Sequence, residues 1–155
     1  MSTYGDLRGG VLDLEPSEAG LEPSEEHPNV WGVVMDLGYP EGTATVVGLS
    51  DGTTSLYTSS GGGVIGGGAH PPVVEATMRW LLIAEDTVGA LDPATEFPLP
   101  DANQVAFAVL TFGGAYRGAA TEEALRDEEH SLAPLFHAGH DVVTELRRAD
   151  EAAQG

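Results

Sequence analysis

Residues Thr53 to Leu91 read TTSLYTSSGGGVIGGGAHPPVVEATMRWLLIAEDTVGAL, and this stretch decides the fold. It joins a Ser/Thr-rich extended segment to two glycine triplets, and then to the most hydrophobic helix of the chain. Pro72 suits the first turn of that helix, because its missing N–H would have no helical partner there. The pattern predicts an exposed or edge strand, a glycine-rich connection and a helix that ends near Leu91.

This predicted helix is apolar over much more than one face. A helix lying on a sheet needs an apolar arc of about 100°, and here Glu75, Arg79 and Asp86 share one narrow polar stripe. The helix is therefore either buried between two layers of its own domain, or covered by a sheet on one side and another protein on the other. We predict a homodimer that uses the following interface residues: Val74, Met78, Trp80, Leu81 and Leu82.

The remaining elements follow from hydrophobic periodicity and turn signals. Alternating apolar residues predict five strands, and a second apolar stripe predicts a C-terminal helix. The strands span 30–37, 43–49, 53–58, 104–112 and 115–120, and the last helix spans 132–149. The predicted fold is α+β, with a five-stranded antiparallel sheet in the order three strands, helix, two strands, helix.

The order of elements between Val30 and Ala149 resembles that of the roadblock and profilin-like α/β domains, in which runs of two and three strands are separated by a helix. The resemblance rests on element order. It implies a non-catalytic scaffold or regulator that pairs through a helix and an edge strand.

Residues 1–28 differ in composition from the rest of the chain. They are acidic, they contain few large apolar side chains, and the sequence LEPSE occurs at 14–18 and again at 21–25. Such a composition predicts a flexible, disordered acidic arm. A single domain at 29–150 and a frayed tail at 151–155 complete the predicted organisation.

The charge of the chain limits its partners. There are 25 acidic residues against six arginines and no lysine, which gives a net charge of −19. This charge repels nucleic acids and anionic membranes and attracts a basic protein partner, although such a composition also arises without a functional cause. The absence of cysteine excludes thiol catalysis and cysteine-bound metals. No apolar run approaches the length of a membrane span, and we expect a cytoplasmic protein.

The glycine-rich segment contains a short motif. Gly61, Gly63 and Gly66 match the letters of a dinucleotide-binding fingerprint, but further residues separate them from the helix, and the preceding strand is not a buried apolar one. We interpret this segment, with His70 at its end, as a structural or mobile loop. A ligand site at Gly61–His70 is the alternative.

Few residues are candidates for a metal site or a catalytic site. His137, His140 and Asp141 share the outer face of the last helix and are of types that bind zinc or iron, but no fourth ligand is identifiable. Asp36 is interpreted as a solvated strand end, with a buried carboxylate as the alternative. We predict no catalytic residue, metal or cofactor.

These observations favour a small acidic, non-catalytic interaction or assembly protein that self-associates or binds a protein partner. One alternative is an acidic inhibitor or immunity-type protein that neutralises a basic enzyme through charge complementarity. The other is a ligand-binding domain that uses the Gly61–His70 loop.

Overall fold

The structure is a computed structural model that describes residues 3–60, 63–65 and 70–154. Within these residues the helices are α1 (Thr3–Leu12), α2 (Pro71–Thr87), α3 (Glu122–Leu125) and α4 (Ala133–Gln154), and the 3-10 turn η2 (Val88–Ala90) follows α2. The strands are β1 (Val30–Tyr39), β2 (Gly42–Leu49), β3 (Thr54–Thr58), β4 (Gly63–Ile65), β5 (Asp92–Pro93), β6 (Gln104–Thr111) and β7 (Gly114–Thr121).

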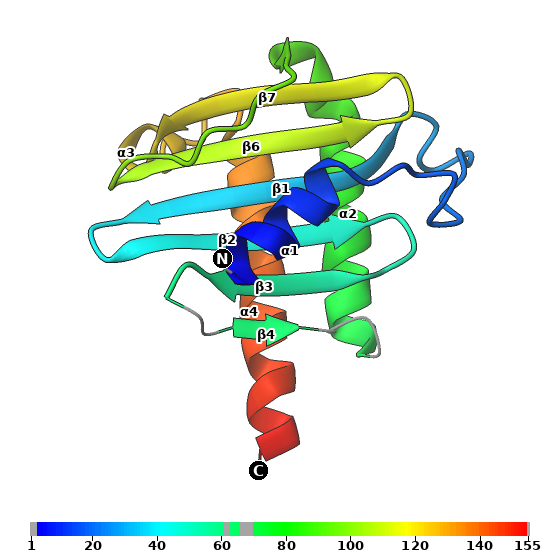
Figure 1. The fold of residues 1–155 in the computed structure, drawn as a ribbon. Helices are drawn as coiled ribbons and strands as arrows, with labels where there is room; N and C mark the ends of the chain where they lie inside the picture. Colours follow the sequence, from blue (N-terminus) through cyan, green and yellow to red (C-terminus); the bar gives the residue numbers. More distant parts are fainter. Residues whose placement is uncertain (1–2, 61–62, 66–69, 155) are drawn as a thin grey trace.

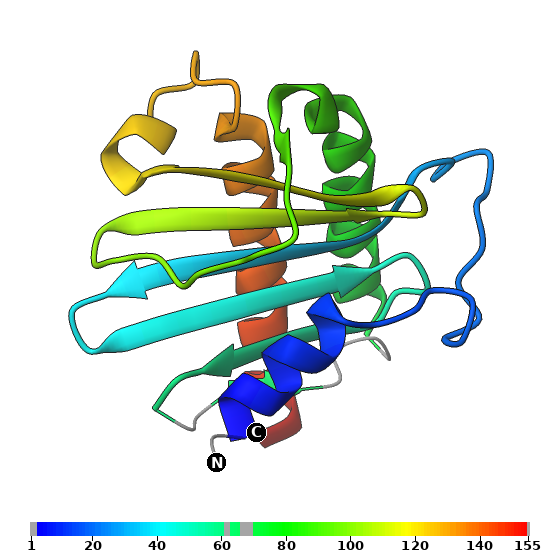
Figure 2. The same cartoon turned by 45° about the horizontal axis from the view of Figure 1, so that its top comes forward.

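The strands form one sheet in the order β4-β3-β2-β1-β6-β7-β5, and every neighbouring pair is antiparallel. Helices α2 and α4 run side by side across one face, and α1 crosses the other (Figure 1). Figure 2 shows the same three layers from a tilted view. The α+β class and the antiparallel sheet are thus confirmed.

The predicted number of five strands is wrong, because β4 and β5 extend the sheet to seven strands. Strand β4 has three residues beside the glycines, and β5 has two residues that pair with β7. Segments this short contain no measurable periodicity. Only the pairing with a neighbouring strand reveals them.

Each central strand divides its side chains between two cores. On β6, Val105, Phe107 and Val109 pack under α2 and α4, while Ala108 and Leu110 face the layer that contains α1. Residues alternate in this way because successive side chains of a strand point to opposite faces. The sheet is therefore covered on both sides, which agrees with the near-continuous apolar sequence of β1.

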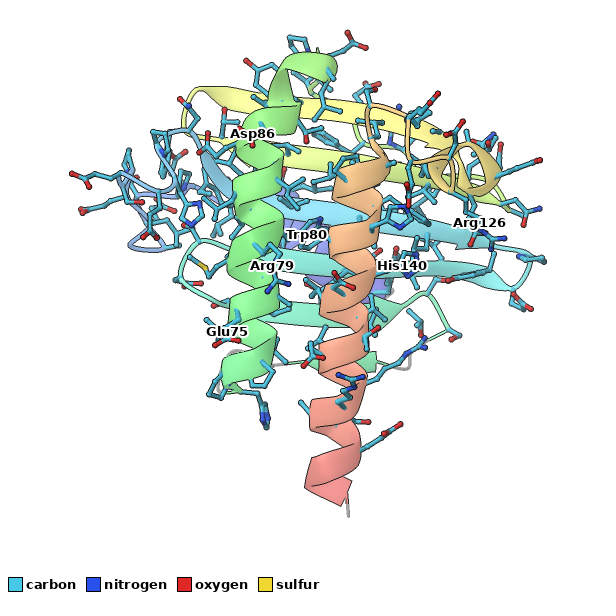
Figure 3. The ribbon with its side chains drawn as sticks, turned by 180° about the vertical axis from the view of Figure 1, so that it is seen from behind. Glu75, Arg79, Trp80, Asp86, Arg126 and His140 are labelled. Carbon is cyan, nitrogen blue, oxygen red and sulfur yellow. The ribbon has the colours of Figure 1, made fainter. Side chains whose placement is uncertain are left out.

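The broad apolar surface of α2 is explained by α4. Trp80 lies between the two helices (Figure 3), and its indole N–H donates a hydrogen bond to the backbone oxygen of Leu135 at 3.0 Å. On the sheet side, a side chain at Gly48 would come within about 3 Å of Thr77 and Trp80. One side of α2 thus meets the sheet and an adjacent side meets α4, so Val73, Ala76, Trp80, Leu81 and Ala84 are buried within a single chain.

Residues 3–12 of the predicted arm are not disordered in the structure. Helix α1 occupies Thr3–Leu12, and both Tyr4 and Leu21 are buried against the sheet. The prediction of a disordered arm therefore does not hold for these residues, whereas residues 13–29 contain neither helix nor strand. The predicted arm contains few large apolar residues, which is why its packing was missed, but Tyr4 and Leu21 are buried in the core on this face of the sheet.

Helix α4 is longer than predicted. It continues to Gln154, so residues 151–154, which were predicted to fray, are helical. None of the helices among the described residues is both long and apolar enough to cross a bilayer.

Candidate functional site

Two of the predicted interface residues cannot contribute to a surface. Trp80 and Leu81 have exposed fractions of 0% and belong to the core beneath α2. Their assignment to an interface is wrong because the second apolar side of α2 is covered by α4 of the same chain. Helix length and periodicity do not show whether an apolar side of a helix is covered by another element of the same chain or by a partner protein.

The other three predicted interface residues lie towards the outside of α2. Val74 and Met78 are partly exposed, and 46% of Leu82 is exposed. They recur every four residues and so form a stripe along the helix. Glu75 and Asp86 are exposed on the same helix (Figure 3). We refer to these five residues as the Leu82 face.

The structure describes the glycine segment only in part. Gly61 and Gly66 lie outside the described residues. Gly63 begins β4 and pairs with Tyr57, so it is part of a strand. His70 is exposed and precedes α2, where its backbone oxygen accepts hydrogen bonds from Val73 and Val74. Its side chain forms no capping hydrogen bond.

The three candidate metal ligands on α4 differ in their surroundings. His137 and Asp141 are exposed, whereas His140 is half-buried, with its ring edge-on to Phe136 at a centroid distance of 4.5 Å. Across residues 3–60, 63–65 and 70–154, no group of three His, Asp or Glu side chains is placed to hold a metal ion.

Asp36 is buried, so its interpretation as a solvated strand end is wrong. Arg8 Nη2 donates to Asp36 Oδ2 at 2.7 Å, and the hydroxyl of Thr45 donates to Oδ1 at 2.6 Å. The Thr45 hydroxyl also contacts the hydroxyl of Tyr4, and Arg8 donates to the backbone oxygen of Phe97 at 2.7 Å. This network joins α1, β1, β2 and the β5–β6 connection, so its role is structural.

A pocket of about 390 Å³ lies on the helical side of the sheet, and we refer to it as the α4 pocket. Its walls are the middle of α4, the β1–β2 turn and the end of β3. The lining residues are Leu37, Tyr39, Glu41, Gly42, Thr43, Ala44, Leu56, Thr58, Ser59, Ser60, His140, Val143, Thr144 and Arg147. This volume lies in the range of small-molecule sites, which is about 300–1,000 Å³.

Helix α4 supplies one continuous wall of the α4 pocket. His140, Val143, Thr144 and Arg147 follow the spacing i, i+3, i+4, i+7, which places them on one helical face. His140 lies on the side of α4 away from α2 (Figure 3). The sequence pattern groups His140 with His137 and Asp141 on an outer face and gives no sign of this second grouping.

The opposite wall is held by the backbone. The Ser59 hydroxyl accepts a hydrogen bond from the Thr43 N–H at 2.9 Å, and the Ser59 N–H donates to the Thr43 oxygen, also at 2.9 Å. Gly42 has φ +150°, and a Cβ there would come within 2.2 Å of the Ser59 hydroxyl oxygen. Only glycine therefore lets the turn close over Ser59 and complete the wall.

The charged groups of the α4 pocket are few. Burial lowers the pKa of His140, and the nearby His137 and Arg147 lower it further, against the opposing effect of Glu122 and Asp141. Besides His140, the lining contains one arginine, Arg147, and one carboxylate, Glu41.

Comparison with models of protein families, with curated proteins and with solved structures found no match. The resemblance to roadblock and profilin-like domains therefore rests on the order of elements alone.

Proposed function

We propose that this chain is a non-catalytic binding protein that docks a basic partner protein on the Leu82 face. The observation that carries the proposal is that the negative charge of the chain lies on its surface. Of the 25 acidic residues, all but Asp36 are at least partly exposed. An acidic surface of this kind accelerates encounter with a basic partner and opposes binding to nucleic acids.

The Leu82 face combines this charge with an apolar anchor. Leu82 is the most exposed large apolar residue of the helical layer, and Glu75 and Asp86 flank it. Helices α2 and α4 together carry seven carboxylates and three arginines. A partner that presents an apolar side chain within a basic rim would complement this surface.

Charge also favours a different protein over a second copy. Two chains of net charge −19 repel each other, and the Leu82 face offers only three apolar side chains to oppose that repulsion. The apolar arc that suggested a homodimer is largely covered by α4. Self-association through Leu82 remains the competing proposal, and an acidic inhibitor of a basic enzyme would be one form of the favoured function.

Site-specific photo-crosslinking would test this proposal. A photoreactive amino acid is placed at position 82 and, as a matched control, at Leu99, which has an exposed fraction of 47% in the β5–β6 connection. The expected result, in cells that express the chain, is a crosslink from position 82 to a basic protein, with none from position 99.

The crosslinked protein is then purified and its affinity measured. We expect Leu82→Glu to weaken binding by about tenfold or more, which is typical of a central apolar anchor, and Leu99→Glu to leave it unchanged. Added salt should also weaken binding. Crosslinks that join two copies of the chain, or that form equally from both positions, would overturn the proposal.

A further inference from the structure

We propose that the α4 pocket is a second binding site, distinct from the Leu82 face, and that it takes a small amphipathic carboxylate with an unbranched apolar chain. The inference rests on the arrangement of an apolar floor, a hydroxyl-rich wall and one guanidinium, that of Arg147, which has no ion pair among the described residues. It is independent of the proposed protein partner.

The floor of the α4 pocket is apolar. Leu37, Ala44 and Leu56 belong to three adjacent strands, and Val143 faces them from α4. Leu37, Leu56 and Val143 are largely buried and belong to the core that supports the helical layer. An alkyl chain placed here would extend an existing apolar surface and leave water.

Hydroxyl groups border this floor. The Thr58 and Ser60 hydroxyl oxygens lie 3.0 Å apart, Ser59 is fixed against Thr43, and Thr144 donates to the backbone oxygen of His140 at 3.1 Å. The Ser59 hydroxyl accepts from Thr43 and still has its proton to donate to the polar end of a ligand, whereas the Thr144 proton is already donated to His140. Because the wall is already ordered, binding would require little conformational change.

Arg147 determines the sign of the charge that a ligand of the α4 pocket would carry. It is exposed at the rim, and among the described residues no carboxylate lies within ion-pair distance of it. The neighbouring Arg148, in contrast, pairs with Glu145 at 2.8 Å. A guanidinium binds a carboxylate through two parallel hydrogen bonds, so Arg147 is suited to one such group.

Glu41 limits the ligand to a single negative charge. It lines the pocket from the β1–β2 turn, and the surrounding protein is strongly acidic. A phosphate ester or dicarboxylate would meet one arginine and a net repulsive field. A monocarboxylate instead places its one charge at Arg147 and its apolar chain away from Glu41.

Titration of the methyl-labelled full-length chain with octanoate would test this inference by NMR. We expect saturable shifts at Leu56 and Val143, with a dissociation constant of about 10 µM to 1 mM, as is typical of a ligand with about ten heavy atoms. 1-Octanol, which has the same chain and no charge, should bind about tenfold more weakly. Octylamine should bind no better than 1-octanol.

Substitutions of Arg147 and Glu41 should affect the affinity for octanoate differently. Arg147→Met should weaken octanoate by about tenfold and leave 1-octanol unchanged. Glu41→Gln should leave octanoate binding unchanged or strengthen it, because a repulsion is removed. Arg79→Met is the matched control, since Arg79 is also exposed and has no ion pair among the described residues, but lines the groove between α2 and α4.

Several results would overturn the inference. Equal binding of octanoate and 1-octanol would indicate an apolar cavity without charge selection. Weaker octanoate binding by Glu41→Gln would show that Glu41 does not repel the carboxylate, which contradicts the assignment of charge selection to this pocket. Absence of saturable shifts in the parent chain would show that the α4 pocket is empty space, and this result does not depend on any variant being folded.

Discussion

Arg8 and Asp36 form an ion pair of 2.7 Å between α1 and the central strand β1, with exposed side-chain fractions of 13% and 4%. The pair is a polar link between the N-terminal helix and the sheet, beside the contact of the Tyr4 and Thr45 hydroxyls. Arg8 also binds the backbone oxygen of Phe97, so one guanidinium joins three segments that are far apart in the sequence. Residues 3–12 are thus part of the domain.

Loss of Arg8 should destabilise the protein strongly. Arg8→Met leaves the Asp36 carboxylate buried without its partner, which costs about 3–5 kcal/mol when the site stays closed. Urea denaturation measures the free energy of unfolding. The double variant Arg8→Met/Asp36→Asn should recover much of the loss, because no unpaired charge remains.

The exposed pair Arg126–Glu122, with side-chain fractions of 72% and 35%, provides the matched control. Arg126→Met should cost less than about 1 kcal/mol, as is usual for surface pairs. If Arg8→Met costs no more than Arg126→Met, then the Arg8–Asp36 pair does not hold α1 on the sheet.

Removal of residues 1–12 should lower the midpoint of thermal unfolding by about 5 °C or more, since about 1 kcal/mol corresponds to 2–4 °C in a chain of this size. The deletion removes Tyr4 and Arg8 and uncovers Trp31, Val34 and Tyr57. Calorimetry gives the midpoint, and binding of a hydrophobic dye reports the uncovered face. An unchanged midpoint without dye binding would mean that α1 contributes nothing to stability.

Truncation of two adjacent leucines on α2 should destabilise the protein to different extents. Leu81 is fully buried, so Leu81→Ala should cost about 2–5 kcal/mol. Leu82 is 46% exposed, so Leu82→Ala should cost less than about 1 kcal/mol. Equal losses in denaturant unfolding would show that α2 is rotated relative to the arrangement described.

His140 should make stability depend on pH below neutrality. Burial lowers its pKa in the folded chain from the ordinary value near 6.5. The unfolded chain therefore binds a proton more readily, and stability decreases as the pH falls through about 6.5 until the folded-state pKa is passed. His140→Gln should thus lose less stability between about pH 7 and pH 5 than the parent does.

The exposed His137 is the control, and His137→Gln should retain the slope of the parent. Chemical denaturation at several pH values compares the three chains, and their many carboxylates affect all of them alike. Parallel profiles for the parent and His140→Gln would show that His140 does not contribute.

The local elements were predictable because their signals lie within single segments. The alternation of Val105, Phe107 and Val109, and the Asp51-Gly52 turn, need no distant residue for their interpretation. The errors arose where partners are distant. Trp80 meets Leu135, 55 residues later, and Asp36 meets Arg8, 28 residues earlier. The α4 pocket likewise combines Leu37 with Arg147, and no local pattern links them.

The sheet ends on both sides in very short strands, and this has a consequence for behaviour at high concentration. Strand β4 has three residues and β5 has two, one of which is Pro93, which lacks an N–H. Long free edges are templates on which further chains polymerise by β-pairing. Short edge strands restrict such a template, and the repulsion between chains of net charge −19 opposes the approach of a second copy. We therefore expect the folded chain to resist fibril formation even when crowded.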